Sequence, residues 1–314
     1  MDKIFGTPTE PLFNEKSNGI SPDILQEWLT TLAVLNSKHV DVSLKHENCL
    51  LLFQGLFKAG KSAEFVFLTC ERLKLSADAK YCAVELFDRF MLKHVNDLYS
   101  HVLKTNSKKQ KKDWNLILDR IKNQVTLRLV SCCQIASKLT SHYKVVTASK
   151  ARRFLNEGGH RYTQESILQS ELRILKTLDF QVTTPSTLVY IETILEILGY
   201  NEPDTEIKVY YEISLKVLEI VYLKFSDIYN SLFQIIVQHQ TFSQDEVRSL
   251  CQVKSDKLLL AVSVIAAAVY VTGFKSDKII ECLHLITKIP LEDIVDFATI
   301  IIQIIIPNEP LPES

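Results

Sequence analysis

Hydrophobic residues in this chain recur mostly at helical spacing, and two stretches are apolar on every side. Residues 125–139 (VTLRLVSCCQIASKL) and 258–271 (LLLAVSVIAAAVYV) carry apolar or small side chains around almost the whole circumference of a helix. Such a helix is stable only when other helices surround it. Two enclosed helices far apart in one chain predict two copies of a small helical domain, each built around its own central helix.

Amphipathic helices are predicted on both sides of the first enclosed stretch. Thr147 and Thr163 can each cap a helix through the side-chain oxygen, and Gly158-Gly159 stops the helix that Thr147 begins. The predicted helices of this domain are 62–73, 79–94, 125–139, 147–156 and 163–178.

The second enclosed stretch has its own set of predicted helices. Pro185 starts a helix that ends before Gly199, and residues 206–224 form the next. Residues 225–253 are less regular and hold one short helical segment at 229–237. Helices 258–271, 276–288 and 291–306 follow. The run Ile300–Ile306 has strong β propensity, but the repeat requires a closing helix there.

These patterns predict an all-α protein with two tandem helical domains, the first of five helices, and a helical N-terminal extension that packs on the first domain. Pro and Gly mark the ends of the chain as irregular. The predicted limits are a flexible tail at 1–22, the extension at 23–60, the first domain at 61–182, the second at 183–306 and a C-terminal tail at 307–314.

Composition supports a folded protein and gives no sign of a polyanion-binding surface. Hydrophobic residues make up 46% of the chain, and 36 Lys and Arg against 37 Asp and Glu leave a formal charge of −1. The seven cysteines are scattered, without the spacing of a zinc site, which predicts reduced core thiols in an intracellular protein. The N-terminus has no signal-peptide core, and 258–271 is too short to span a membrane.

One segment is locally basic. Residues 101–113 are predicted to form a solvated loop containing five lysines, Lys104, Lys108, Lys109, Lys111 and Lys112. The segment is either a charged surface insertion or a patch that serves nuclear import or contacts phosphates. Ser107 lies within it, and the sequence leaves open whether that residue is modified.

Several motifs together resemble the cyclin family, which is built from two five-helix cyclin boxes. Residues 83–90 (AVELFDRF) are similar to the second helix of the first box, and 135–138 (IASK) to the end of its third helix. Residues 171–180 (ELRILKTLDF) match the fifth helix and its exit. The resemblance is strong in the first box and rests on pattern alone in the second.

Four further segments resemble a narrower group of cyclin-like proteins. They are 64–68 (EFVFL), 90–93 (FMLK), 127–132 (LRLVSC) and 190–201, which begins YIET and ends LGYN. The resemblance implies a role in meiosis, in the maturation of crossover-designated recombination intermediates. It also implies a nuclear, chromosome-associated location, with a cytoplasmic pool left open.

The same resemblance implies a partner-binding face. In cyclins a lysine at the end of the third helix and a glutamate in the fifth hydrogen-bond backbone groups of a cyclin-dependent kinase; Lys138 and Glu171 occupy these positions. Apolar positions that match those flanking the pair are Ile135, Leu139, Leu175, Phe180 and Val182. The pair either contacts a kinase or only ties two helices together, and both alternatives stay open at this point.

Other positions depart from the cyclin pattern. An arginine and an aspartate that form a salt bridge in the family are replaced by Ala59 and Glu64, and the patch that docks substrate peptides is replaced by Lys58, Ser62 and Phe65. The acidic pair that usually follows Ala-Ser-Lys is Thr140-Ser141. These departures weaken the expectation of a conventional kinase-activating cyclin.

No catalytic motif or metal-ligand spacing occurs in the sequence, so no cofactor, metal, small-molecule substrate or membrane is expected. The prediction is a non-enzymatic cyclin-like adaptor whose partners are a cyclin-dependent kinase and meiotic recombination proteins. A kinase-activating cyclin is the first alternative. A cyclin-fold nucleic-acid-binding factor is the second, and the near-zero charge makes direct DNA binding the least favoured.

Overall fold

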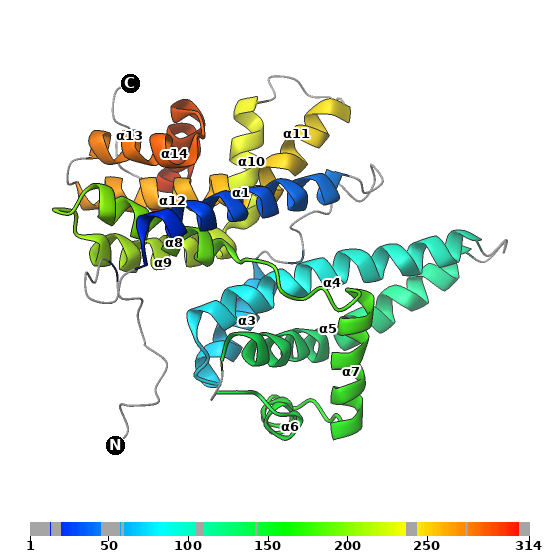
Figure 1. Cartoon of the computed structure of the whole chain (residues 1–314). Coiled ribbons are helices and arrows are strands. Elements are labelled where there is room, and N and C mark those ends of the chain that lie inside the picture. The colour runs from blue at the N-terminus through cyan, green and yellow to red at the C-terminus, as the bar shows by residue number, and fades with distance from the viewer. Residues whose placement is uncertain are drawn as a thin grey trace, which may run out of the picture. The chain divides into compact units, whose positions relative to one another are not determined.

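The computed structural model contains helices and connecting segments, and no strand, in the part of the chain that it describes. The described residues are 13, 20–44, 57, 60–104, 110–141, 144–236, 244–273 and 276–307. Thirteen helices fall within these ranges (Figure 1). The predicted all-α class is confirmed.

The chain divides into two compact units. The first is Phe53–Thr184, and the second combines Met1–Leu52 with Pro185–Ser314, so the first unit is inserted into the sequence of the second. Five described helices build the first unit: α3 (Lys61–Arg72), α4 (Ala77–Lys104), α5 (Gln110–Thr140), α6 (Ala148–Glu157) and α7 (Gln164–Thr177).

The core of the first unit forms around α5. Every residue of α5 from Leu129 to Ser137 is at most 3% exposed, and α3, α4, α6 and α7 all pack against this helix. The enclosed helix predicted from the sequence is therefore confirmed. The predicted caps are also present: Thr147 accepts a hydrogen bond from the Lys150 amide at 3.3 Å, and Thr163 from the Ser166 amide at 3.1 Å.

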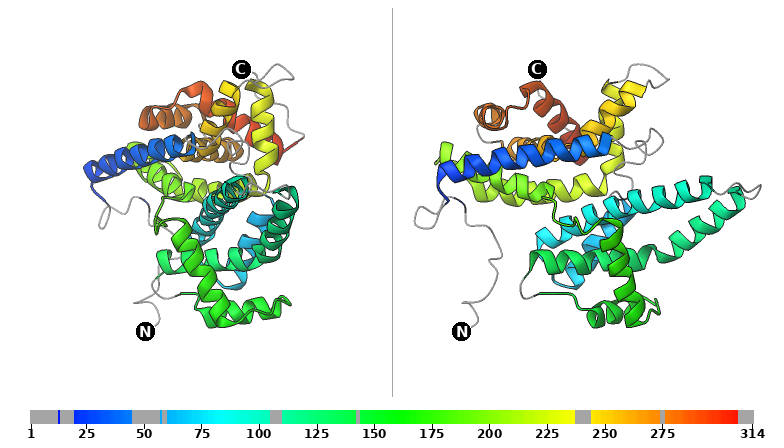
Figure 2. Two further views of the ribbon diagram at one scale, coloured as in Figure 1. Left: turned by 90° about the vertical axis from the view of Figure 1, so that its right-hand side faces the viewer. Right: turned by 45° about the vertical axis from the view of Figure 1, so that its right-hand side comes forward.

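Helices α4 and α5 are longer than predicted and continue side by side away from the other helices of the first unit (Figures 1 and 2). Apolar residues recur along both at the spacing of a coiled-coil seam. These are Met91, Val95, Leu98 and Val102 on α4, and Trp114, Leu118, Ile121 and Val125 on α5. The Tyr99 and Trp114 rings meet edge to face, with centroids 5.1 Å apart.

The prediction of a loop over 101–113 is therefore wrong at both ends. His101–Lys104 belong to α4, and Gln110–Asp113 belong to α5. Lysine is a good helix former, and a seam residue, Trp114, lies directly after the basic stretch, so the helical pattern continues through residues that look like a solvated loop in isolation.

Eight described helices build the second unit: α1 (Pro22–Leu44), α8 (Thr187–Asn201), α9 (Ile207–Leu223), α10 (Phe225–Ile236), α11 (Gln244–Ser255), α12 (Lys257–Thr272), α13 (Ser276–Thr287) and α14 (Leu291–Ile305). Helix α12 lies at the centre, and α1, α8, α9, α13 and α14 pack around it. From Leu260 to Val269 every residue of α12 is at most 3% exposed, which confirms the second enclosed helix. Helix α14 extends through Ile305, so the isoleucine run is helical as predicted.

Three sequence-based expectations for the second unit are corrected. The N-terminal helix α1 packs on α8 and α11 and belongs to this unit, so it is not an extension packed on the first domain. Residues 225–253 are largely helical, in α10 and α11. Gly199 lies inside α8, which continues to Asn201. The second half of the predicted extension, residues 45–60, lies outside the described residues except for Phe57 and Gly60, as do most of both tails.

Among the described helices, none alone has the length and apolar character needed to cross a membrane. Residues Asp245–Ser255 and Lys257–Thr272 meet that criterion only as a pair, and the pair is bent by 65°.

Candidate functional site

Lys138 and Glu171, the pair implied by the cyclin resemblance, lie together in the first unit. The Lys138 ammonium, at the end of α5, donates a hydrogen bond to Glu171 Oε1 in the middle of α7. The two side chains differ in exposure, at 42% for Lys138 and 10% for Glu171. A mostly buried carboxylate therefore holds a lysine whose outer part stays open to solvent.

A third residue, Gln134, completes the arrangement and was not predicted. Its Nε2 donates to Glu171 Oε2 at 3.0 Å, so both carboxylate oxygens are bound from α5. Gln134 and Lys138 are four residues apart and thus share one face of the helix. Binding both oxygens offsets the free-energy cost of burying the carboxylate, and it fixes the direction in which Lys138 points.

The register between α5 and α7 is set one turn earlier along α5, by hydrogen bonds to the residue before Glu171 on α7. Ser131 donates to the Ser170 hydroxyl at 2.8 Å, and the Arg128 guanidinium donates to the same hydroxyl at 2.8 Å. Ser170 immediately precedes Glu171. Because these bonds fix the α7 backbone against α5, they position the Glu171 carboxylate beneath the lysine.

Exposed leucines border the ion pair. Leu139 on α5 is 40% exposed, and Leu168 and Leu172 on α7 are 48% and 37% exposed. Leu168, Leu172 and the half-buried Leu175 recur at helical spacing, so they form one apolar stripe beside Glu171. We name Leu139, Leu168, Leu172 and Leu175 the leucine rim.

Two of the rim residues were missed as site residues. Leu168 and Leu172 follow the same period as Ile167 and Ile174, which are fully buried, and the sequence does not tell which side of α7 faces α5. Ile135, in contrast, was expected on the partner-binding face. It is 3% exposed and belongs to the core around α5, where no partner can reach it without rearrangement.

The chain leaves α7 through a turn that presents Phe180. Asp179 and Phe180 both have positive φ, at 50° and 58°, and the Phe180 amide donates to the Leu175 carbonyl at 2.8 Å. This is the Schellman pattern, in which glycine is the usual residue at the first left-handed position. The Phe180 side chain is 62% exposed, and Val182 beyond it is half-buried.

Helix α4 holds this exit turn in place. Lys93 forms an ion pair with Asp179. Arg89 donates to the Gln181 carbonyl at 2.7 Å and to the Thr184 hydroxyl at 3.2 Å, and burial lowers the pKa of its guanidinium. Neither role was predicted, because both partners are more than eighty residues away in sequence.

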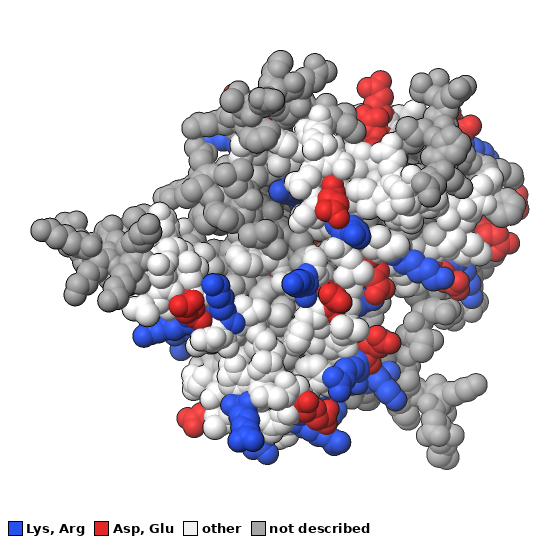
Figure 3. Space-filling view, turned by 180° about the vertical axis from the view of Figure 1, so that it is seen from behind, with Lys and Arg blue, Asp and Glu red and all other residues white. Residues whose placement is uncertain are grey.

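The predicted basic patch lies at the ends of α4 and α5. Lys104 is the last residue of α4, Lys111 and Lys112 lie in the first turn of α5, and Lys108 and Lys109 fall outside the described residues. The side chains of Lys104, Lys111 and Lys112 also lie outside the described part, so the patch remains a prediction. Figure 3, which views the molecule from behind, shows Lys and Arg interspersed with Asp and Glu.

The thiols and other potential metal ligands form no metal site in the described part of the chain. No group of three or more His, Cys, Asp or Glu residues is arranged to hold a metal ion in the described ranges. None of the six described cysteines forms a disulfide, and burial raises the pKa of the Cys132 thiol. Cys49 lies outside the described residues. Phe65, one of the residues that replace the cyclin substrate-docking patch, packs against the core cluster that contains Leu127 and Ile167.

The fold defines a class: an all-α protein of two bundles, each built around an enclosed helix. Residues 60–183, which cover the first bundle, match the family Cyclin, N-terminal domain. Over 272 residues, or 83% of this chain, the sequence is 36% identical to Cyclin N-terminal domain-containing protein 1 of Mus musculus, covering 80% of that protein. The Homo sapiens protein of the same description is 35% identical over 247 residues, which are 78% of this chain and 75% of that protein. The chain therefore belongs to the cyclin family, in the group of Cyclin N-terminal domain-containing protein 1, and the resemblance drawn from its motifs is confirmed.

Proposed function

We propose that this chain is a non-enzymatic cyclin-like adaptor that binds a cyclin-dependent kinase through the Lys138–Glu171 pair and the leucine rim. By that contact, and by binding recombination proteins, it promotes maturation of meiotic crossover intermediates in the nucleus, in association with chromosomes. The observation that carries the proposal is a partly exposed ion pair bordered by exposed leucines, at the positions where cyclins hold a kinase.

The composition of this face supports binding to another protein. An apolar centre with a few fixed polar anchors is typical of protein interfaces. Leu139, Leu168 and Leu172 supply exposed apolar area, and Phe180 adds an aromatic side chain on a turn fixed by Arg89 and Lys93. Because Glu171 and Gln134 hold it, Lys138 loses little conformational freedom on binding.

The purely structural alternative is that the ion pair only ties α5 to α7. The Ser131, Arg128 and Ser170 bonds already fix this contact, so the tie does not depend on the ion pair alone. A lysine that served only as a tie would also gain nothing from keeping 42% of its side chain exposed.

A charge exchange separates the two alternatives. The double variant Lys138→Glu/Glu171→Lys retains an ion pair between the helices but reverses the charges that a partner meets. We expect it to unfold at nearly the same denaturant concentration as the wild type, and to bind a cyclin-dependent kinase at least about tenfold more weakly than the wild type, a loss of about 1.4 kcal/mol.

The matched control is the same exchange at the exposed pair Lys278 and Glu202 in the second unit, whose Nζ and Oε2 atoms are 2.6 Å apart. It leaves kinase binding unchanged. Titration of the purified full-length chain against a panel of cyclin-dependent kinases measures both. Equal kinase affinity of the wild type and the Lys138/Glu171 exchange would leave only the structural role.

Two further experiments address the alternatives to an adaptor. If the chain is a kinase-activating cyclin, its addition raises kinase activity, and the Lys138/Glu171 exchange abolishes that rise. If it is a nucleic-acid-binding factor, it binds DNA with an affinity that falls steeply with salt and is lost on replacing Lys108, Lys109, Lys111 and Lys112. The meiotic role is tested by replacing the endogenous protein with the exchange variant and counting crossovers, which we expect to fall.

A further inference from the structure

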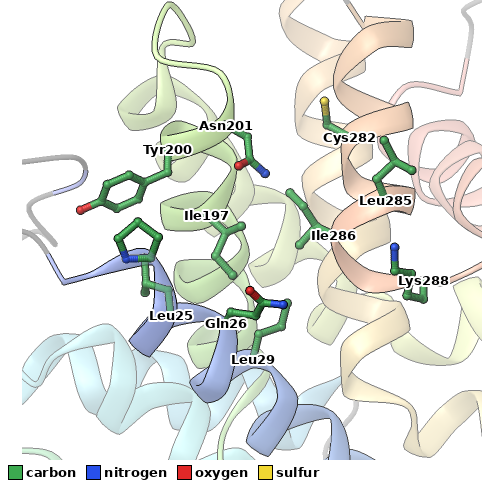
Figure 4. Close-up of a pocket in the computed structure, with 11 residues that line it drawn as sticks. Leu25, Gln26, Leu29, Ile197, Tyr200, Asn201, Cys282, Leu285, Ile286 and Lys288 are labelled. Carbon is green, nitrogen blue, oxygen red and sulfur yellow. The ribbon is translucent and has the colours of Figure 1, made fainter.

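A groove of about 490 Å³ lies within the second unit, between α1, α8 and α13 (Figure 4). Its floor is aliphatic and comes from all three helices, with Ile197 of α8 and Ile286 of α13 facing each other across it. The four aliphatic floor residues are Leu25, Leu29, Ile197 and Ile286. A volume of this size is in the range of sites that hold ligands or a few side chains.

Two carboxamides, those of Gln26 and Asn201, line the same groove. In Figure 4 they lie on opposite sides of Ile197, one from α1 and the other from the end of α8. Neither side chain forms a hydrogen bond with another described residue. A carboxamide offers both a donor and an acceptor, which is the combination that pairs with a peptide group.

A cation, Lys288, stands at one side of the groove. Lys288 follows α13 with φ of 62°, a left-handed conformation that costs free energy for any residue with a side chain. Among the described carboxylates none pairs with it, whereas Lys278 on α13 is paired with Glu202. Glycine at position 288 would relieve the backbone strain, but the residue there is a lysine, whose positive charge lies beside the aliphatic groove.

The rim is open. Leu285 is 61% exposed, and the side chains of Gln26 and Asn201 are also exposed. Small-molecule sites enclose most of their ligand, while a groove with an exposed apolar edge and polar groups on opposite sides suits a segment of polypeptide.

We propose that this groove binds a short segment of a partner protein that carries aliphatic side chains and an acidic residue. The aliphatic side chains pack on Ile197 and Ile286, the backbone of the segment hydrogen-bonds Gln26 and Asn201, and its carboxylate pairs with Lys288. The groove belongs to the second unit and shares no residue with the Lys138–Glu171 face, so it does not rest on the proposed kinase contact.

The probe is a library of random peptides displayed on phage, selected on the purified full-length chain. We expect the recovered peptides to share two aliphatic residues and an Asp or Glu. Synthetic versions should bind Lys288→Gly at least about tenfold more weakly than the wild type, while Lys288→Arg retains most of the affinity. Gln26→Ala, at an exposed position, should weaken binding severalfold.

The control is Lys74→Gly. Lys74 follows α3 in the first unit with φ of 53°, so the substitution has the same backbone effect far from the groove in sequence. Both glycine variants are expected to remain at least as stable as the wild type, which separates loss of binding from loss of fold.

Three results would overturn the proposal. One is that selected peptides lack an acid or bind Lys288→Gly as tightly as the wild type. Another is that peptides bind only after removal of residues 308–314, which would make the chain's own tail the occupant. The third is concentration-dependent self-association in sedimentation that Lys288→Gly abolishes, which would make the occupant a second copy of the chain.

Discussion

The carboxamide of Asn36 on α1 donates to the carboxylate of Asp256 before α12, Nδ2 to Oδ1 at 2.9 Å, although 220 residues separate them in sequence. Asn36 Oδ1 in turn accepts the Lys257 amide at 2.9 Å, and Asp256 Oδ1 accepts the Leu259 amide at 2.8 Å. The first backbone N–H groups of a helix have no partner within it. Here one residue from α1 and one from the chain next to α12 satisfy them together.

The first prediction follows from this shared cap. Asn36→Ala removes the acceptor of a buried amide and one partner of Asp256, and it should lower the free energy of unfolding by about 2 kcal/mol. Chemical denaturation measures the change. The control is Ser37→Ala, which removes an exposed bond to the Ala33 carbonyl and should cost less than about 0.5 kcal/mol. Equal effects of the two substitutions would contradict the role of Asn36.

The second prediction concerns the exit turn. Arg89→Lys keeps a positive charge but lacks the planar fork that reaches both Gln181 and Thr184. We expect a loss of about 1 to 2 kcal/mol in stability and weaker kinase binding, because Phe180 is no longer held in one position. Arg152→Lys, at an exposed site on α6, is the control and should change neither quantity. Unchanged kinase binding in Arg89→Lys would remove Phe180 from the proposed interface.

The third prediction concerns pH. His94 stacks on Phe90 with ring centroids 5.0 Å apart; burial and the nearby Arg128 and Arg173 lower its pKa from the ordinary value of 6.5, while Asp97 opposes this. Between the folded and unfolded pKa values the unfolded chain binds more protons, so stability rises with pH in this window. The free energy of unfolding should therefore fall as the pH drops below about 6.5.

His94→Gln should flatten that part of the pH profile, as measured by denaturation at several pH values. The exposed His160→Gln serves as the comparison and should leave the profile unchanged. A wild-type stability that rises on acidification through this window would have the opposite sign and would contradict the assignment.

The fourth prediction compares two left-handed positions that follow helices. Gly159 has φ of 81° with open space around it, so Gly159→Ala should cost about 1 kcal/mol from backbone strain alone. Lys74 has φ of 53°, and Lys74→Gly should raise the free energy of unfolding by a few tenths to about 1 kcal/mol. Opposite signs in the two denaturation curves are the expected result, and a loss of stability in both would show that Lys74 contributes contacts.

Local sequence patterns predicted what depends on local chemistry. The enclosed segments of α5 and α12 are recognisable because apolar residues surround the helix, and Thr147 and Thr163 because a cap involves residues three positions apart. Helix ends were less predictable. The lysines around 104–112 look like a loop, yet they adjoin a coiled-coil seam whose members lie on two different helices.

The remaining features depend on residues distant in sequence. In the sequence Asn36 looks like an ordinary polar residue, because its role depends on Asp256, which lies beside it only in the folded chain. In the same way, the role of Arg89 depends on the distant exit turn. Lys138 and Glu171 were found by family resemblance, but Gln134 was not, because only the packing of α5 on α7 brings it to the carboxylate. The same packing decides which leucines of α7 are exposed.

The insertion of the first unit into the sequence of the second has a consequence for synthesis. Asp256 leaves the ribosome 220 residues after Asn36, which at usual elongation rates is roughly 10–45 s. During that interval the inserted unit can fold as it emerges, while the apolar side chains of α1 stay uncovered until α8 is made, and those that pack on α11 and α12 stay uncovered longer. The nascent chain thus carries a partly exposed hydrophobic helix until α11 and α12 are made, and chaperones have their main opportunity to bind it before then.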